Sequence, residues 1–155
     1  MLFRSKVPEA LNNQLGIAVA KRAYKAYLGL LSSPRWMRAY NAGARPQRLL
    51  WASTGTKDPK ASDVLYVKAL AAPFTVDTIP EGTLHALAEH GVIEATMPAD
   101  GGDCEEILAR FAGANVDVRS LSVKLQDEGA KSFVNSWNDL MAVINSKCAV
   151  LERAS

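Results

Sequence analysis

Apolar residues spaced three and four positions apart recur along the first fifth of the chain. They are Leu15, Ile17, Ala20, Tyr24, Tyr27, Leu28 and Leu31. This spacing predicts an amphipathic helix from about Pro8 to Leu31, with the proline in its first turn. Ser33 followed by Pro34 then predicts the start of a shorter helix, which ends before Gly43.

Two short apolar stretches further along have the character of strands. Arg48–Ser53 is a compact apolar run, and the Arg45-Pro46-Gln47 segment before it is extended because residues preceding proline avoid the helical region. Phe74–Ile79 alternates between its two faces. Helices at Ser62–Leu70 and Pro80–Gly91 complete a strand–helix–strand–helix order, which is the repeating unit of parallel α/β folds.

The last third of the sequence predicts only helices and loops. A loop over Ala95–Gly102 precedes a helix that Asp103 begins, and Asp117 begins another that ends at Gly129. The final helix carries one apolar stripe, typical of packing. Its members are Phe133, Trp137, Leu140, Met141, Ile144, Cys148 and Leu151.

Composition excludes several classes of protein. Hydrophobic residues make up 48% of the 155 residues, which favours a packed core over disorder. A net charge of +2 gives no reason to expect nucleic acid or an anionic membrane as a partner, and no apolar run approaches a membrane span. Two distant cysteines and two histidines form no metal-type cluster, so we expect no metal. The lack of a membrane-length or signal-peptide-like apolar segment favours a cytoplasmic location, where both thiols would be reduced.

Polar groups follow the first predicted strand at once. They are Ser53, Thr54, Gly55, Thr56 and Lys57. Hydroxyls, a glycine and a cation at the carboxyl end of a parallel strand suit an anion such as phosphate. A plain polar loop has the same composition, and short motifs are weak evidence, so these residues alone leave both interpretations open.

A longer pattern adds a family resemblance. Arg45–Pro59 reads R-P-Q-R-L-L-W-A-S-T-G-T-K-D-P, which resembles the penultimate barrel strand of transaldolases. Ser62–Leu70 and Ala72–Glu81 are similar to the helix and final strand that follow it. Residues 97–103 and 128–147 are similar to the C-terminal extension, so the resemblance runs from about Lys6 to the end. One departure is Asp77, where the family has asparagine.

The resemblance implies a fold larger than this chain. Transaldolases are (β/α)₈ TIM barrels, which need roughly 250 residues. We therefore expect an α/β fold that is the C-terminal portion of such a barrel, with two parallel strands, mostly helices and a C-terminal helical extension. Residues 1–5 are expected to be a non-native leader, residues 6–94 the last part of the barrel and residues 95–155 the extension.

The implied activity is transfer of a three-carbon dihydroxyacetone unit between sugar phosphates in the pentose phosphate pathway, through a Schiff base and without a cofactor. The implied partners are fructose 6-phosphate, sedoheptulose 7-phosphate, erythrose 4-phosphate and glyceraldehyde 3-phosphate. The family's Schiff-base lysine lies on a middle strand, upstream of this chain. For the substrate phosphate we expect Ser53 and the Gly55 amide, with Lys57 in place of the family's arginine and Thr54 as a weaker ligand.

Alternatives remain open for the fragment itself. None of its lysines lies inside a predicted strand, so we expect no catalytic residue and no turnover by this chain alone. It would then be a non-catalytic, helix-rich fragment or interaction module, or a sugar-phosphate binder. The form of the family sometimes fused to glucose-6-phosphate isomerase is the one it resembles. Exposed edges of two strands also favour self-association.

Overall fold

A computed structural model describes residues 7–154, which form two compact units. The first, here called the α/β unit, ends at Ala114, and the C-terminal unit begins at Asn115. The predicted leader and Lys6 lie outside the described residues. The predicted boundary between residues 94 and 95 stays a prediction about the whole barrel.

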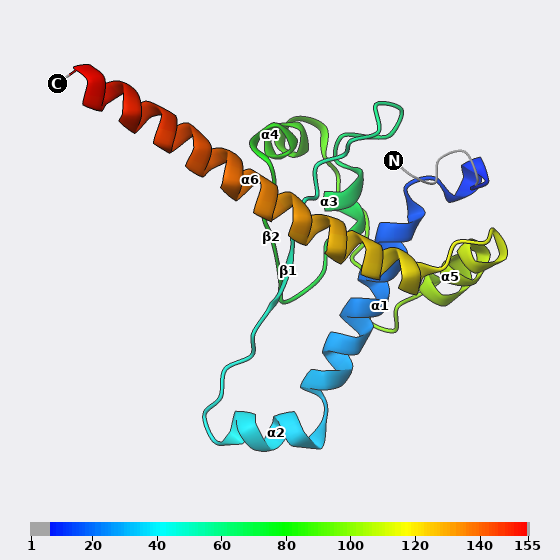
Figure 1. Ribbon diagram of the computed structural model, residues 1–155. Helices are drawn as coiled ribbons and strands as arrows, with labels where there is room; N and C mark the ends of the chain where they lie inside the picture. Colours follow the sequence, from blue (N-terminus) through cyan, green and yellow to red (C-terminus); the bar gives the residue numbers. More distant parts are fainter. Residues whose placement is uncertain (1–6, 155) are drawn as a thin grey trace. The chain divides into compact units, whose positions relative to one another are not determined.

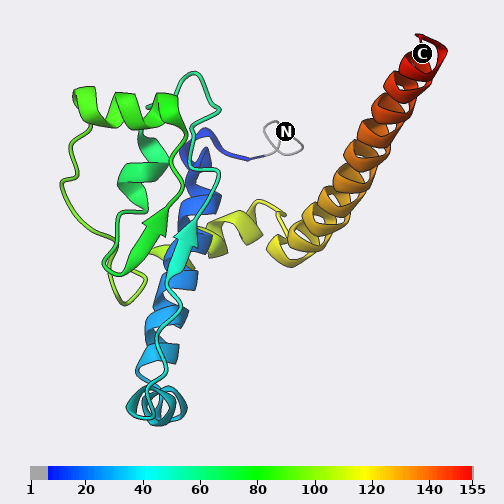
Figure 2. The same ribbon diagram turned by 90° about the vertical axis from the view of Figure 1, so that its left-hand side faces the viewer.

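The α/β unit is mostly helical, with two short strands side by side (Figures 1 and 2). Its elements are a 3₁₀ turn at Glu9–Leu11, α1 (Gln14–Leu31), α2 (Pro34–Asn41), β1 (Leu49–Trp51), α3 (Leu65–Ala69), β2 (Thr75–Asp77), α4 (Glu81–His90) and α5 (Cys104–Gly113). The strands are parallel, with Leu50 opposite Val76. This confirms the predicted mixed α/β class with two parallel strands, as expected for part of a TIM barrel.

The first helix and both strands are shorter than predicted, because single residues near their ends adopt left-handed backbone conformations. The first helix was predicted from Pro8, but Asn13 adopts a left-handed conformation (φ 61°) that separates the 3₁₀ turn from α1. Phe74 (φ 61°) and Ser53 (φ 59°) likewise lie outside the extended region, which removes the ends of the predicted strands. Side-chain periodicity carries no signal for such single-residue reversals.

The core of the α/β unit lies where α1 packs beside the strands and α3. Ala20 and Tyr24 of α1 meet Leu70, which follows α3, and Met97 of the following loop. Leu49 and Trp51 of β1 pack on this cluster. The Tyr24 hydroxyl also donates to the Pro73 carbonyl oxygen at 3.3 Å, which links α1 to the entry of β2.

Two ion pairs join α1 to α5, which packs against it. Lys21 donates to Asp103 at 2.6 Å, and the Arg22 Nε donates to Glu105 at 2.9 Å. Asp103 is the N-cap residue of α5, as predicted, but its carboxylate makes no capping hydrogen bond and binds Lys21 instead. Ser33 does cap α2 as predicted, accepting from the Trp36 amide at 3.2 Å.

The C-terminal unit is one helix, α6 (Val118–Ala154), of 37 residues. Asp117 begins it as predicted, accepting hydrogen bonds from the amides of Arg119 and Ser120. The predicted break at Gly129 is wrong. Strong helix formers flank the glycine on both sides, and a glycine inside a helix costs only about 1 kcal/mol relative to alanine.

Most side chains of the apolar stripe on α6 are exposed. Phe133 is 82% exposed and Trp137 is 62% exposed. The expectation that these side chains pack against the outer helices of a whole barrel stays a prediction. No helix among residues 7–154 is long and apolar enough to cross a membrane.

Candidate functional site

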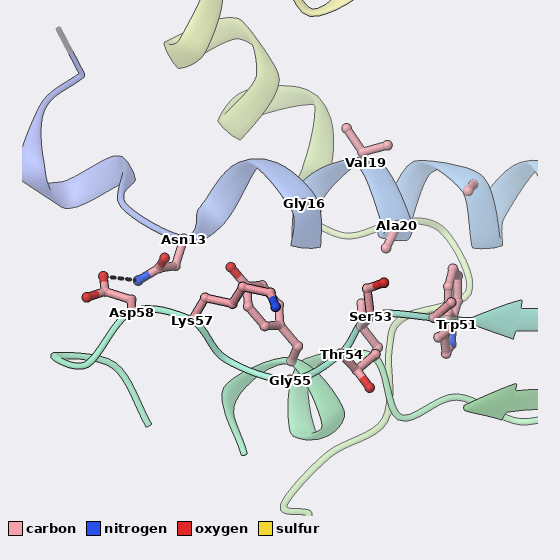
Figure 3. Close-up of a pocket in the computed structure, with 14 residues that line it drawn as sticks. Asn13, Gly16, Val19, Ala20, Trp51, Ser53, Thr54, Gly55, Lys57 and Asp58 are labelled. Atoms are coloured by element: carbon pink, nitrogen blue, oxygen red, sulfur yellow. Dashed lines mark hydrogen bonds between the residues drawn. The ribbon is translucent and has the colours of Figure 1, made fainter. Parts of the chain in front are cut away.

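A cavity of about 790 Å³ lies between α1 and the loop that leaves β1 (Figure 3). On the α1 side, small and apolar residues line it, including Gly16, Val19 and Ala20. On the other side it is lined by the polar segment singled out from the sequence: Ser53, Thr54, Gly55 and Lys57, with Asp58. The structure thus brings all four predicted ligands to one cavity, but it gives them different environments.

Ser53 occupies the carboxyl end of β1 in a left-handed conformation. Its φ of 59° is uncommon for a residue other than glycine, and such outliers cluster at binding and active sites. The residue is exposed. Figure 3 shows its hydroxyl on the side of the loop that faces α1, opposite to the hydroxyl of Thr54. The strand end therefore presents Ser53 to the cavity.

Thr54 turns toward the second strand. It is only 2% exposed, and its hydroxyl donates to the Asp77 carboxylate at 2.9 Å. Thr78 makes a parallel link, because its amide and hydroxyl both donate to the Trp51 carbonyl at 3.0 and 3.2 Å. These hydrogen bonds join the carboxyl ends of β1 and β2 and fix the start of the loop after β1.

Gly55 lies against the turn that begins α4. A Cβ added to it would meet the Pro80 ring at 3.2 Å, so a larger residue would push the loop away from that turn. The hydroxyl of the next residue, Thr56, donates to the Asp63 carbonyl at 3.2 Å. The path of the backbone past Ser53 is therefore set by close packing as well as by hydrogen bonds.

Lys57 provides the positive charge of the cavity. Its side chain is exposed and runs along the side of the loop that faces α1 (Figure 3). The next residue, Asp58, accepts a hydrogen bond at 3.0 Å from the amide group of Asn13, the left-handed residue before α1. This contact closes one end of the cavity and joins α1 to the loop.

Sequence reasoning missed the α1 wall of the site, including Asn13 and Gly16. A run of small residues on one face of a helix was its only signal, and small residues are equally common in ordinary helix packing. Trp51 lines the cavity and also packs on the core. Its indole N–H is buried and has no hydrogen-bond partner among the described residues.

The pKa values of Asp77 and Asp63 are shifted in opposite directions. Burial raises the pKa of Asp77, and the hydrogen bond from Thr54 opposes this only in part. On α4, His90 lies 3.0 Å from Asp63 and lowers the pKa of that carboxyl. Within residues 7–154 no group of three or more acidic, cysteine or histidine side chains is placed to hold a metal ion.

This geometry, with polar residues at the carboxyl ends of parallel strands, is the arrangement used by α/β-barrel enzymes for their substrates. A profile of the family Transaldolase/Fructose-6-phosphate aldolase matches residues 2–144. The chain therefore belongs to the transaldolase/fructose-6-phosphate aldolase family.

Individual relatives agree with this assignment. The chain is 45% identical over 140 residues to the transaldolase of Parafrankia sp. (strain EAN1pec), which covers 90% of this chain and 38% of that protein. It is 46% identical over 134 residues to the transaldolase of Mycolicibacterium paratuberculosis, covering 85% and 36% respectively. The chain thus spans a little over a third of the length of the curated relatives it matches.

Proposed function

We propose that this chain carries the phosphate-binding part of a transaldolase site, and that it binds sugar phosphates in the cavity between α1 and the loop after β1. The observation that carries the proposal is Ser53. It is held at the strand end with its hydroxyl toward a cavity that also contains Lys57. The relatives, which are transaldolases by name, supply the substrate class.

The roles of the four predicted ligands follow from their contacts. The Ser53 hydroxyl donates a hydrogen bond to a phosphate oxygen. Lys57 compensates the negative charge of the phosphate as a point cation. The Gly55 amide is the backbone donor of the same loop. Thr54 contributes least, because its hydroxyl already donates to Asp77.

The proposed parent reaction is transfer of a three-carbon ketol unit between sugar phosphates. A lysine forms an imine with the ketose carbonyl, so that the carbanion left after carbon–carbon cleavage is delocalised. That lysine must lose its proton near neutral pH, which requires a desolvated or cationic setting. The described lysines of this chain lie in helices or in the loop at residues 57–60, outside β1 and β2. We propose that the chain alone binds substrate without turning it over.

Isothermal titration with fructose 6-phosphate and with fructose tests the binding proposal. A charge-assisted hydrogen bond contributes about 1.5–3 kcal/mol, so Ser53→Ala should weaken binding of the phosphorylated sugar roughly ten- to a hundredfold. Binding of fructose should not change. Ser62→Ala, in the same loop region but outside the cavity, is the matched control. An equal loss of affinity for both sugars would show that Ser53 is not a phosphate ligand and that residues 53–57 are an ordinary polar loop.

Borohydride trapping tests the proposal that turnover is absent. After incubation with fructose 6-phosphate and borohydride, the intact mass of the chain should be unchanged, because no imine forms. A stable adduct on any lysine would overturn this part of the proposal while leaving the binding result intact.

A second candidate role, self-association, rests on the sheet. It contains two strands, so each has one edge without a strand partner in the described part of the chain. Sedimentation velocity over a range of concentrations should show a dimer, and Val76→Pro on β2 should reduce it. A concentration-independent monomer would exclude this role.

A further inference from the structure

A second concave site lies at the opposite end of the strands from Ser53. Arg48 immediately precedes β1 and Phe74 immediately precedes β2, so both lie at the amino ends of the parallel pair. Between them and α2 is a groove of about 520 Å³. We call it the arginine groove, and it is lined by Tyr27, Trp36, Tyr40, Arg45, Arg48 and Phe74, with Leu31, Met37 and Pro46.

Within residues 7–154, the only charged residues that line the arginine groove are Arg45 and Arg48, which are both positive. None of its lining residues is acidic, and neither Arg45 nor Arg48 forms an ion pair with a carboxylate of the described residues. The sequence around it continues this pattern, because no Asp or Glu occurs between Ala10 and Lys57. Of the cations in that stretch, Arg35, Arg38, Arg45 and Arg48 belong to α2 or to the segment between α2 and β1. Lys21 and Arg22 are instead paired with Asp103 and Glu105, and Lys57 lies at the opposite end of the strands. An anion would therefore be attracted to this end of the unit.

The walls of the groove are aromatic. One of these residues, Phe74, has a strained backbone, and another, Tyr27, has a hydroxyl without a hydrogen-bond partner among the described residues. Phe74 is 75% exposed in a left-handed conformation (φ 61°), which is unfavourable for a bulky side chain. The Tyr27 hydroxyl is buried and has no hydrogen-bond partner among the described residues. A buried polar atom without a partner is unusual, and a ligand atom is one thing that can satisfy it.

We propose that the arginine groove binds a small aromatic anion, of the size of a nucleoside monophosphate. The planar ring stacks on Phe74 and Tyr40, and the anionic group binds Arg45 and Arg48, which can hold phosphate or carboxylate oxygens in a bidentate manner. The Tyr27 hydroxyl donates to an acceptor on the ring or sugar. The volume lies within the usual range for small-molecule sites.

The test titrates the whole chain with adenosine 5′-monophosphate and follows the indole N–H signals of its three tryptophans by NMR. The Trp36 signal should move, and adenosine or inorganic phosphate alone should bind at least about tenfold more weakly, because each offers only half of the contacts. Arg48→Gln should weaken binding of the nucleotide by roughly tenfold or more. Arg35→Gln, on α2 but outside the groove, is the matched control and should leave the affinity unchanged.

The variant Phe74→Asn distinguishes the contribution of the Phe74 ring to binding from its effect on folding. Asparagine tolerates the left-handed conformation, so this variant should fold at least as well as the parent chain while it loses most of the affinity for the nucleotide. Ser53→Ala should have no effect, which distinguishes this site from the sugar-phosphate cavity. Inorganic phosphate that binds as tightly as the nucleotide, or nucleotide binding that survives both Arg48→Gln and Phe74→Asn, would overturn the proposal. So would a dimer in which this groove is covered by a second copy and the nucleotide does not bind.

Discussion

Thr54 donates a hydrogen bond of 2.9 Å to Asp77 across the carboxyl ends of β1 and β2. The threonine is 2% exposed, and Asp77 lies opposite Trp51 in the strand register. One bond from a hydroxyl does not compensate a carboxylate for its lost hydration, and burial accordingly raises the pKa of Asp77. Asp77 is also the position where the family resemblance implies asparagine, which would accept the same bond without a charge.

Asp77→Asn should therefore stabilise the fold at neutral pH. A carboxyl whose pKa is raised on folding destabilises the fold increasingly as pH rises above its ordinary value of about 3.9, until the folded group is ionised as well. The variant should melt at a higher temperature than the parent at pH 7, and the two should converge at pH 3. Thermal unfolding followed by circular dichroism at both values measures this difference.

Thr54→Val supplies the complementary control. It leaves the Asp77 carboxylate without its donor, so the melting temperature at pH 7 should fall and the pH dependence should become steeper. A lower melting temperature for Asp77→Asn at pH 7 would mean that the charge contributes to stability through a contact other than this one.

Acid should loosen the attachment of α5 to α1. Lys21 lowers the pKa of Asp103, and Arg22 lowers the pKa of Glu105, in both cases chiefly through the side-chain hydrogen bond. Carboxyls with a lowered pKa stabilise the fold above their ordinary values near 4, and that stability is lost as pH falls through the lower folded values. Protection of α5 amides measured by hydrogen exchange, corrected for the intrinsic rate, should thus decrease between pH 5 and pH 2, as the carboxyls titrate.

The double variant Asp103→Asn/Glu105→Gln is the control for this loss. It should have weaker α5 protection at pH 7 and little further change in acid. Asp103, Arg22 and Glu105 are each at least half exposed, although Lys21 is only 21% exposed, so the effect should be modest. Protection of α5 that is independent of pH in the parent chain would show that its apolar face alone holds it.

Gly129→Ala tests the continuity of α6. The glycine is inside the helix, and an added Cβ would meet no atom within 4 Å. Alanine should therefore raise the stability of the helix by about 1 kcal/mol. Helix content measured by circular dichroism at 222 nm during thermal melting is the readout.

Gly29→Ala and Gly43→Ala bracket this result. Gly29 is also in an open helical position and should respond like Gly129, whereas Gly43 has a φ of 96° and should lose stability when replaced. If Gly129→Ala behaved like Gly43→Ala, the glycine would be the end of a helix, as its residue type alone suggests.

Tyr24 should be the most sensitive position of α1. Its ring is 3% exposed in the core and its hydroxyl bonds to Pro73, so Tyr24→Ala should cost about 3–5 kcal/mol. Tyr24→Phe keeps the ring and should cost only about 1 kcal/mol. Leu30→Ala, on the same helix but 59% exposed, should change the free energy of unfolding by less than about 0.5 kcal/mol. Urea unfolding measures all three, and equal effects of Tyr24→Ala and Leu30→Ala would place the core elsewhere.

Local sequence was sufficient to predict most of the helices and both strands of the α/β unit. The spacing of apolar residues predicted α1, the Ser33-Pro34 pair predicted the start of α2, and Pro80 and Gly91 bracketed α4. The strand–helix–strand order also predicted that β1 and β2 are parallel, because a helical crossover returns the chain in the same direction. The polar segment Ser53–Lys57 could be singled out because it follows an apolar run without a break.

Only the tertiary structure decided which way the members of that segment face. Ser53 and Thr54 are neighbours with similar side chains, yet one hydroxyl faces the cavity and the other is buried against Asp77. The left-handed turn at Ser53 and the contact of the loop with Pro80 produce this division, and neither leaves a periodic pattern. Likewise, Asp103 has the residue type of a helix cap, but Lys21, 82 positions earlier, binds its carboxylate. Local sequence determines which elements form, whereas partners distant in the chain determine what each polar side chain contacts, because those contacts exist only after the elements have packed.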